Sequence, residues 1–341
     1  MPTTNGGARS PVAQVRAAVA HGVAGVLPGV VGVGCSGGAD SLALADAMID
    51  ELGAPNVVVL AIDHGLAADT ARVCADVVTW ARGRGAAALV RQVAVDAEAS
   101  LEAAARRARY AAFDALAAEL GLVAIALAHT ARDQAETVLM RLVRGTGPAG
   151  LAAMAPVRGI YLRPLLGLPR AVIDDYVVAR ALAPWADPMN ADPRFQRTRV
   201  REALLPALRR ENPAIDDALC RLATSAREWT LVIDAAAAPF TTFPIDRDQL
   251  AAQPAAVRKR ALALAIERAG GGYSTEQLDR VDGAIAATAP RYPRVIEVHR
   301  LALRIDKRAI AIAARGAPRS AGRISRVYGF ASGRKGPTLE G

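Results

Sequence analysis

Residues 35–41 read Cys-Ser-Gly-Gly-Ala-Asp-Ser and combine the residue types that a phosphate-binding loop needs. Two adjacent glycines permit a tight turn in which the backbone can approach a ligand closely, and the amides that follow would lie at a helix N-terminus. Ser36 and Ser41 add hydroxyl donors. Asp40 suits such a loop if a Mg²⁺ ion lies between its carboxylate and the phosphate. The segment therefore predicts a phosphate or pyrophosphate site.

Other glycine-rich loops fit this segment less well. A Walker loop needs the lysine of GxxxxGK[ST] on the β- and γ-phosphates, but the first lysine of the chain is Lys259. A dinucleotide loop is matched only loosely, because Gly32 and Gly34 have the right spacing but no supported acidic residue for a ribose follows. An ordinary turn between strand and helix would explain the glycines but not Asp40. The sequence favours a phosphate loop without lysine.

The elements that would position this loop alternate between short apolar runs and helical patterns in the first half of the chain. Strands are predicted at 30–35, 56–62, 87–95 and 123–128, and helices at 41–51, 70–84, 100–120 (with Ser100 as N-cap) and 132–144. Continuous apolar strands alternating with helices predict an α/β fold with a doubly wound, mostly parallel sheet. Ligands bind beyond the carboxyl ends of such strands. Residues 36–41, 63–65 and 129–133 are therefore expected at one edge.

The second half of the chain has a different pattern. The stretches 145–150 and 156–169, dense in glycine and proline, indicate a transition, and alanine-rich helices are predicted at 200–210, 214–238 and 255–269. Residues 294–312 alternate in hydropathy, which predicts a short terminal β-ribbon. We expect a catalytic domain at 1–210, a smaller, mainly helical domain at 211–313, and a basic, disordered tail at 314–341.

Charge is distributed unevenly along the chain. The net charge is +9, yet residues 1–150 hold 12 basic and 14 acidic side chains, against 30 and 19 in the remainder. A basic second half predicts a polyanionic partner, although arginine-rich composition explains part of the excess.

Three cysteines without a CxxC pair indicate neither a zinc site nor a disulfide framework, and fit a reducing cytoplasm. The uncharged stretch 17–39 is interrupted by glycines and by Pro28, so no membrane span is expected.

The Ser-Gly-Gly-x-Asp-Ser segment after a strand resembles the signature of the N-type ATP pyrophosphatases, or PP-loop enzymes, whose fold is adenine nucleotide α-hydrolase-like. Further blocks are similar to the tRNA(Ile)-lysidine synthase family. They are Asp-His-Gly-Leu at 63–66, the arginine-rich helix at 104–110, His-Thr-Ala-Arg-Asp-Gln-Ala-Glu-Thr at 129–137, 139–151 ending after Arg-Gly-Thr-Gly, Arg-Pro-Leu-Leu at 163–166, and 185–197. The resemblance runs from about residue 28 to residue 210. Ala67 and Thr198 depart from the family's usual Arg and Asn, which puts their local contacts in doubt.

The resemblance implies a ligase. ATP would adenylate the C2 carbonyl oxygen of the wobble cytidine in tRNA(Ile) with a CAU anticodon, and free L-lysine would then displace AMP to give lysidine. The implied catalytic residues are Asp40, Arg109, His129, Asp133 and Arg201. ATP would lie on Ser36, Gly37, Gly38, Ala39, Asp40 and Ser41, with Asp40 holding Mg²⁺. An arginine cluster would contact tRNA through Arg194, Arg197, Arg199 and Arg201, and the helical domain at 211–313 with its terminal β-ribbon would also bind tRNA.

Simpler interpretations stand beside these roles. Asp133 could be a helix N-cap, His129 a structural histidine, Glu136 a solvated helix residue and Trp185 a core residue. The rival functions are another AMP-forming PP-loop enzyme, either a tRNA-thiolation enzyme or a small-molecule synthetase, and a non-catalytic RNA-binding protein of the same fold. The oligomeric state is left open, with a homodimer as one alternative.

Overall fold

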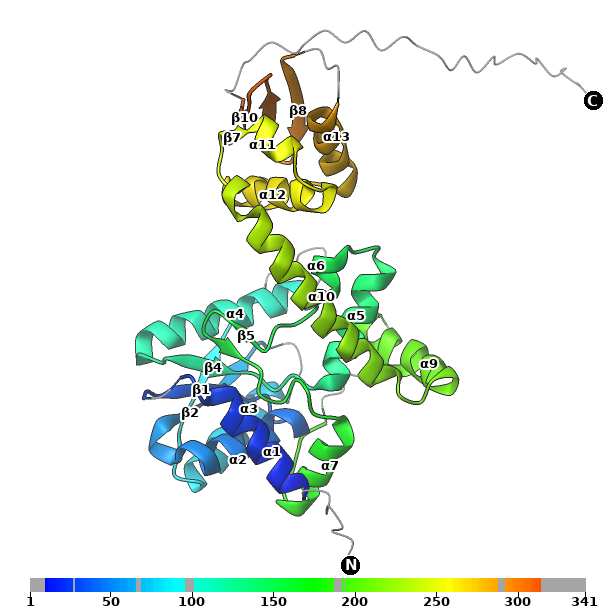
Figure 1. Ribbon diagram of the computed structural model, residues 1–341. Helices are drawn as coiled ribbons and strands as arrows, with labels where there is room; N and C mark the ends of the chain where they lie inside the picture. The colour runs from blue at the N-terminus through cyan, green and yellow to red at the C-terminus, as the bar shows by residue number, and fades with distance from the viewer. Residues whose placement is uncertain are drawn as a thin grey trace, which may run out of the picture. The chain divides into compact units, whose positions relative to one another are not determined.

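The computed structural model describes residues 10–26, 28–65, 69–95, 101–186, 192, 194–287 and 292–313. The expected N-cap at Ser100 and the expected tail at 314–341 lie outside these residues. The chain divides into two compact units between Thr230 and Leu231 (Figure 1). In the described parts, none of the helices combines the length and the apolar character that crossing a membrane requires.

The first unit is built on a six-stranded sheet. Its order is β3 (Ala87–Gln92), β2 (Val57–Asp63), β1 (Val31–Gly34), β4 (Ala124–Ala126), β6 (Tyr161–Leu162) and β5 (Val157–Arg158). All neighbours are parallel except β5 and β6, and Val31 of β1 is in register with Val57 and Ala124. The predicted doubly wound, mostly parallel sheet is confirmed. Strands β5 and β6 fall in the glycine- and proline-rich region, where two-residue strands leave no detectable periodicity.

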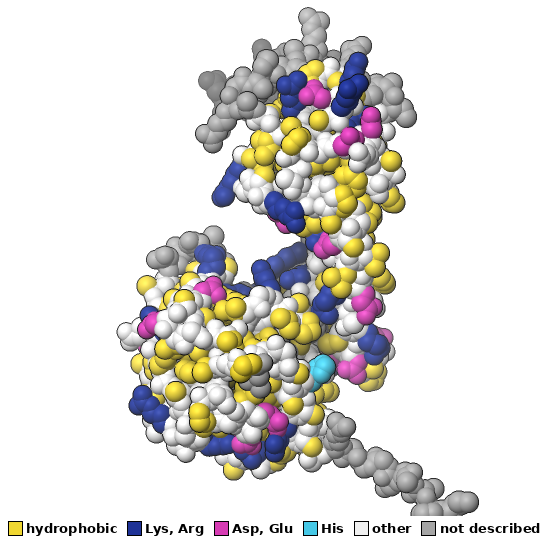
Figure 2. Space-filling model, turned by 60° about the vertical axis from the view of Figure 1, so that its left-hand side comes forward, with side chains coloured by type: hydrophobic (Ala, Val, Ile, Leu, Met, Phe, Trp, Pro, Cys, Tyr) yellow, Lys and Arg dark blue, Asp and Glu magenta, His cyan; other side chains and the backbone are white. Residues whose placement is uncertain are grey.

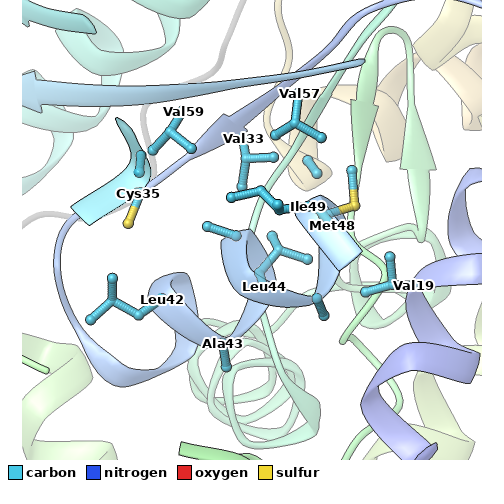
Figure 3. Packing of buried hydrophobic residues seen from close by; sticks show 14 of the residues in the cluster. Val19, Val33, Cys35, Leu42, Ala43, Leu44, Met48, Ile49, Val57 and Val59 are labelled. Carbon is cyan, nitrogen blue, oxygen red and sulfur yellow. The ribbon is translucent and has the colours of Figure 1, made fainter. Parts of the chain in front are cut away.

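Helices cover both faces of this sheet. They are α1 (Pro11–Val23), α2 (Ala39–Leu52), the 3-10 turn Ala54–Asn56, α3 (Thr70–Gly83), α4 (Leu101–Leu120), α5 (Ala131–Val143), α6 (Pro148–Leu151) and α7 (Arg170–Ala179). On one face α1, α2, α3 and α7 pack on the strands, and Figure 3 shows Val19 and Met48 near the strand residues Val33 and Val57. On the other face α4 contributes Phe113. A Cβ at Gly34 would lie 2.8 Å from the Phe113 ring, so that glycine serves close packing of α4.

Beyond the sheet, the chain continues through a broken helix. It consists of α8 (Gln196–Arg199), a π-helical turn (Val200–Leu204), α9 (Leu205–Glu211) and α10 (Ile215–Ala237). Leu219 and Ala223 of α10 are buried against Val138 of α5. The start of α10 therefore belongs to the first core, which places the division between the units inside this helix. The expected domain boundary was after residue 210.

The second unit has its own core. It contains a four-stranded antiparallel sheet, whose order is β7 (Ile245–Asp246), β10 (Ala309–Ile312), β9 (Leu301–Ile305) and β8 (Arg294–Val298). The sheet packs with the 3-10 turn Ala238–Phe240, α11 (Arg247–Ala251), α12 (Ala255–Arg268) and α13 (Thr275–Ala286). Leu262, Ile285 and Leu303 are buried in its centre. The mainly helical unit with terminal antiparallel strands is confirmed, and β7 extends the predicted ribbon.

Candidate active site

The loop at 36–41 is held in one conformation by its own hydrogen bonds. The Ser36 amide donates to the Ser41 hydroxyl at 3.1 Å, and that hydroxyl donates to the Gly38 carbonyl at 2.9 Å. Gly37 has φ +80°, and a Cβ there would lie 2.6 Å from Val73 Cγ1. Among the described residues, no side chain caps α2, whose N-cap is Gly38. The N-terminus of α2, with Ala39 as its first residue, can therefore receive an anion.

A second segment lies against this loop. The Trp185 amide donates to the Gly37 carbonyl at 2.9 Å. The Trp185 side chain is half-buried rather than enclosed in the core. This contact brings the first residue of the 185–197 block to the phosphate loop.

Asp40 lies in the first turn of α2 and pairs with a residue that sequence analysis missed. Arg170, the first residue of α7, donates to Asp40 at 2.5 Å and also contacts Asp174 at 2.8 Å. Burial raises the pKa of Asp40, and the positive charge of Arg170 opposes this shift. Because 130 residues separate Asp40 from Arg170, only the fold reveals the pair.

The three predicted segments follow β2, β1 and β4, which are neighbours in the sheet. Asp63, at the end of β2, is buried, and its carboxylate accepts from the Gly65 amide at 3.0 Å and from Gln92 at 3.4 Å. The Asp63 side chain therefore stabilises the turn that follows β2 at this edge of the sheet. The expectation that the segments meet at one edge of the sheet is confirmed by this strand order.

Asp133 is both a cap and a member of the site. Its Oδ2 accepts from the Thr130 amide at 2.8 Å and from the Thr130 hydroxyl at 3.0 Å, which forms a capping box on α5. Its Oδ1 accepts from Arg197 at 3.0 Å. Burial by itself raises the pKa of Asp133, but Arg197 and the Thr130 amide outweigh burial and leave the pKa below its usual value. The carboxylate is therefore ionised at neutral pH.

Glu136 is the most enclosed charge of the site. Its side chain is fully buried, and it accepts from Arg197 at 2.6 Å and from Arg201 at 2.7 and 3.0 Å. Arg132 adds a third guanidinium at 3.8 Å. The interpretation of Glu136 as a solvated residue is therefore wrong, since a buried carboxylate needs such partners. Nothing in the local sequence distinguishes it from an exposed helical glutamate.

The predicted tRNA-contacting arginines divide into two pairs. Arg197 and Arg201 turn inward to the carboxylates of Asp133 and Glu136. Arg194 and Arg199 are exposed. Figure 2 shows basic side chains in several separate groups on the visible face, with acidic side chains between them. At the surface, Arg194 pairs with Asp192 at 2.7 Å, and Arg199 donates to the Arg194 carbonyl at 2.7 Å.

His129 is kept neutral by its surroundings. Burial lowers the pKa of His129 to about 3; Asp133 opposes this shift, and positive charges including Arg163 and Arg197 add to it. Its Nδ1 is buried and, among the described residues, has no hydrogen-bond partner. Arg109, exposed on α4, lies within electrostatic reach of Arg197. The structure therefore gathers His129, Asp133 and Arg201. Asp40 interacts electrostatically with Asp133 from the neighbouring strand end, and Arg109 is linked to this group only through its interaction with Arg197.

Two further arginines complete this edge of the sheet. Arg163 follows β6, is buried, and donates to the Ala155 carbonyl at 2.9 Å. The Nε atoms of Arg163 and Arg132 are buried without a hydrogen-bond partner in the part of the chain that the structure describes. A cavity of about 120 Å³ lies beside Arg132 and Arg170. Buried polar atoms without partners are rare in folded proteins, so a water molecule or a bound anion would satisfy these two guanidiniums.

Mg²⁺ is compatible with Asp40. The described residues contain no cluster of three or more His, Cys, Asp or Glu side chains arranged as metal ligands. However, Mg²⁺ in nucleotide sites is commonly held by one or two carboxylates together with phosphate oxygens and water. Asp40, at the open end of the loop, can supply one such carboxylate once it separates from Arg170. The donor set therefore fits a nucleotide-bound Mg²⁺ rather than a site made of protein alone.

Comparison with known proteins agrees with this geometry. Residues 14–208 match the family model described as the PP-loop domain. A tRNA(Ile)-lysidine synthase of Leifsonia xyli subsp. xyli is 42% identical over 250 residues, covering 69% of this chain and 75% of the relative. One of Salinispora tropica is 44% identical over 236 residues, covering 66% of this chain and 70% of the relative.

A solved structure shares the fold. The U34-tRNA thiolase NcsA from Methanococcus maripaludis, with its [4Fe-4S] cluster, matches with a TM-score of 0.54 and 17% identity over 64% of this chain and 80% of that one. At this identity the likeness concerns the fold alone. The identities of about 40% and the PP-loop match confirm the resemblance that the motifs indicated: this chain belongs to the tRNA(Ile)-lysidine synthase family of PP-loop proteins.

Proposed function

We propose that this protein is a ligase that joins free L-lysine to C2 of cytidine 34 in tRNA(Ile) with a CAU anticodon. ATP is consumed to AMP and pyrophosphate through an adenylated cytidine. The observation that carries the proposal is the meeting of a phosphate loop with a buried acid–arginine cluster at one edge of the sheet, in a chain of this family. We also propose that it acts in the cytoplasm, where tRNA, ATP and lysine occur together.

ATP binding follows from the loop and its cations. The amides at the start of α2 and the hydroxyls of Ser36 and Ser41 supply donors for pyrophosphate oxygens. Arg170 and Arg132 supply the positive charge that a Walker lysine supplies elsewhere. Asp40 would hold Mg²⁺, which when bound neutralises negative charge on the phosphates. The triphosphate would thus be held with its α-phosphate directed toward the strand ends of β1 and β4.

The proposed chemistry has two displacements. The cytidine O2 attacks the α-phosphorus and pyrophosphate leaves; the lysine ε-amine then attacks C2 and AMP leaves. Both steps depend mainly on positioning and charge stabilisation. Arg201 and Arg109 would stabilise charge on the phosphoryl oxygens as bonds form and break. Neutral His129 would accept a hydrogen bond at Nδ1.

Asp133 is assigned to bind the lysine ammonium rather than to remove its proton. Arg197 and the Thr130 amide lower the pKa of Asp133, which makes it a weak base at neutral pH. A carboxylate that stays ionised is instead suited to hold a cation before the reaction. The ammonium first loses one proton to solvent, which gives the neutral amine that attacks C2, and a second proton then passes from the attacking nitrogen to solvent or to the departing AMP.

The deciding experiment measures labelled lysine transfer. The protein is incubated with Mg-ATP, labelled lysine and tRNA(Ile) of anticodon CAU, beside a tRNA in which C34 is replaced. Label that depends on C34 and is lost in Asp40→Ala supports the proposal, with Asp175→Ala as the matched control on an exposed carboxylate of α7. AMP formation without label in tRNA would instead indicate a small-molecule synthetase. Binding of tRNA without ATP consumption would indicate a non-catalytic RNA-binding protein.

A further inference from the structure

Three polar pairs that join helix α2 to helix α7 and its C-cap share one offset in the sequence. In each pair the second partner lies 130 residues after the first. These α2–α7 pairs are Asp40–Arg170 at 2.5 Å, Asp46–Tyr176 at 2.7 Å and Asp50–Arg180 at 2.8 Å. Because both helices rise by about 1.5 Å per residue, a constant offset means that they run parallel in a single register.

The middle pair is buried and strongly bonded. The Asp46 side chain is fully buried, and it accepts from Tyr176 and from Arg180 at 2.7 Å each. Arg84, the C-cap residue of α3, contacts Asp46 as well, and it also reaches Asp50 at 2.7 Å. Burial raises the pKa of Tyr176 to about 12, so its hydroxyl keeps the proton that it donates. A carboxylate is buried in this way only where such partners hold it.

The apolar contacts between the two helices define their register less sharply. Helical spacing from Asp40 places Ala43 and Ala47 on the same face of α2, and both are fully buried. A methyl group fits against many positions of a neighbouring helix, so these alanines alone would permit α7 to slide along α2. A slide of one turn, about four residues, would bring Asp174 opposite Asp40, where the two carboxylates would repel each other. The polar pairs therefore select the observed register, which is a recognised use of buried polar groups.

The register of α7 determines where its first residue, Arg170, lies. Displacing α7 by one turn would move Arg170 by about 5.4 Å, which breaks its contact with Asp40 and takes its charge away from the loop at 36–41. The Asp40–Arg170 pair is partly exposed at this loop. Asp46 and Asp50 lie further along α2, at about 9 and 15 Å from Asp40 along the helix axis. The two inner pairs are therefore too distant to contact the phosphates themselves.

We propose that Asp46, Asp50 and Tyr176 are positioning residues for ATP binding, because they hold α7 in the register that places Arg170 at the phosphate loop. The inference rests on the proposed function for the role of Arg170. Asp40 must leave Arg170 in order to hold Mg²⁺, so the outer pair cannot fix α7 while the nucleotide is bound. The inner pairs lie away from the loop and stay intact in that state.

Binding of Mg-ATP to the full chain, measured by isothermal titration calorimetry, tests the proposal. Tyr176→Phe removes one hydrogen bond to Asp46 without leaving its arginines unpaired, and Asp50→Asn removes one charge near the end of α2. Each variant is expected to weaken Mg-ATP binding by about three- to tenfold, the value of one hydrogen bond. In the Arg170→Ala background the same substitutions should change the dissociation constant by less than about twofold, because they act through Arg170. Residues with a merely structural role would weaken binding equally in both backgrounds.

Glu51→Gln is the matched control. Glu51 follows Asp50 in α2 and its side chain is exposed to nearly the same extent, 19% against 21%, but it pairs with Arg16 of α1 rather than with α7. The substitution removes a carboxylate from the same end of α2 and leaves the α2–α7 pairs intact. The dissociation constant for Mg-ATP should therefore stay within about twofold of that of the unaltered protein.

The outcomes separate this proposal from the proposed function. Full affinity in Tyr176→Phe and Asp50→Asn would overturn the positioning role, and so would an equal loss in Glu51→Gln or losses that add fully to that of Arg170→Ala. The expected pattern of affinities in a protein that transfers no lysine to tRNA would uphold the positioning role while refuting the proposed function. Lysine transfer by the unaltered protein together with fully additive losses would do the reverse.

Discussion

Replacing Glu136 by glutamine is expected to destabilise the protein and disorder the active site together. The buried carboxylate accepts three hydrogen bonds from Arg197 and Arg201 and has Arg132 at 3.8 Å. The amide removes the negative charge but leaves the guanidiniums facing one another. Breaking a buried pair in this way costs about 3–5 kcal/mol.

The exposure of the partners sets the expected value within that range. The side chains of Arg197 and Arg201 are 26% and 20% exposed, so water can partly solvate them after the substitution. We therefore expect the free energy of unfolding to fall by about 3 kcal/mol, near the lower limit for a buried pair. Urea denaturation of the Glu136→Gln variant measures this change. Glu202→Gln, on an exposed carboxylate of the neighbouring π-helical turn, should stay within about 0.5 kcal/mol of the unaltered protein.

A double-mutant cycle separates the ion pairs from general packing. Arg201→Gln is combined with Glu136→Gln, and the coupling between the two should be about 1.5–3 kcal/mol if the hydrogen bonds contribute as charge-assisted bonds do. Lysine transfer per folded molecule should also fall, because Arg201 loses its orientation. A Glu136→Gln variant as stable as the unaltered protein, or a coupling near zero, would refute this account of the cluster.

Three other predictions concern the loop and the neighbouring strand end. Arg170→Ala should raise the KM for ATP about 10- to 100-fold, as expected when one charge-assisted hydrogen bond is removed. Asp175→Ala, at an exposed position of the same helix, should leave this KM unchanged, and initial rates at varied ATP check both expectations. Gly37→Ala should cost about 1–3 kcal/mol of stability, because residue 37 has a positive φ and its Cβ would lie close to Val73. Adding Val73→Ala should remove the clash with Val73 but not the backbone strain, and thermal melts measure both changes. The pKa of His129 is about 3 in the folded protein and about 6.5 in the unfolded chain. Between these two pH values the imidazole is protonated only in the unfolded state. The free energy of unfolding should therefore fall as the pH drops from 6.5 toward 3. His129→Gln should reduce that slope by up to about 1.4 kcal/mol per pH unit; equal slopes in urea titrations would contradict it.

Local patterns predicted the central sheet but not the full arginine set. Loop residues 36–41 combine strand, glycine pair and helix within a dozen positions, so their geometry follows from nearby sequence. Asp133 was identifiable because its strand and helix are contiguous. Arg170 and Glu136 were not, since their roles depend on partners 130 and 65 residues away. Arg163 follows a two-residue strand, too short for a periodic signal.

The same limit explains the division of the arginine cluster. Arg194, Arg197, Arg199 and Arg201 are equivalent in composition and spacing, and a count of charges predicts a single polyanion-binding surface. The structure instead turns Arg197 and Arg201 toward buried carboxylates and leaves the other two exposed. The direction of each inward guanidinium is set by Glu136, which no pattern in the arginine segment reveals.

The cations of this site share a chemical property that bears on the proposed reaction. Every basic side chain that the site gathers is an arginine or a histidine, and the chain has no lysine before Lys259. An adenylated cytidine is an electrophile that awaits a primary amine, and a lysine side chain beside it would compete with the free amino acid. A guanidinium stays protonated at any physiological pH and is a poor nucleophile, yet it binds phosphate at least as well as an ammonium does. Arg132, Arg170 and Arg201 can therefore neutralise the phosphates without consuming the intermediate, which makes the shortage of lysine in the first unit compatible with lysine as the substrate.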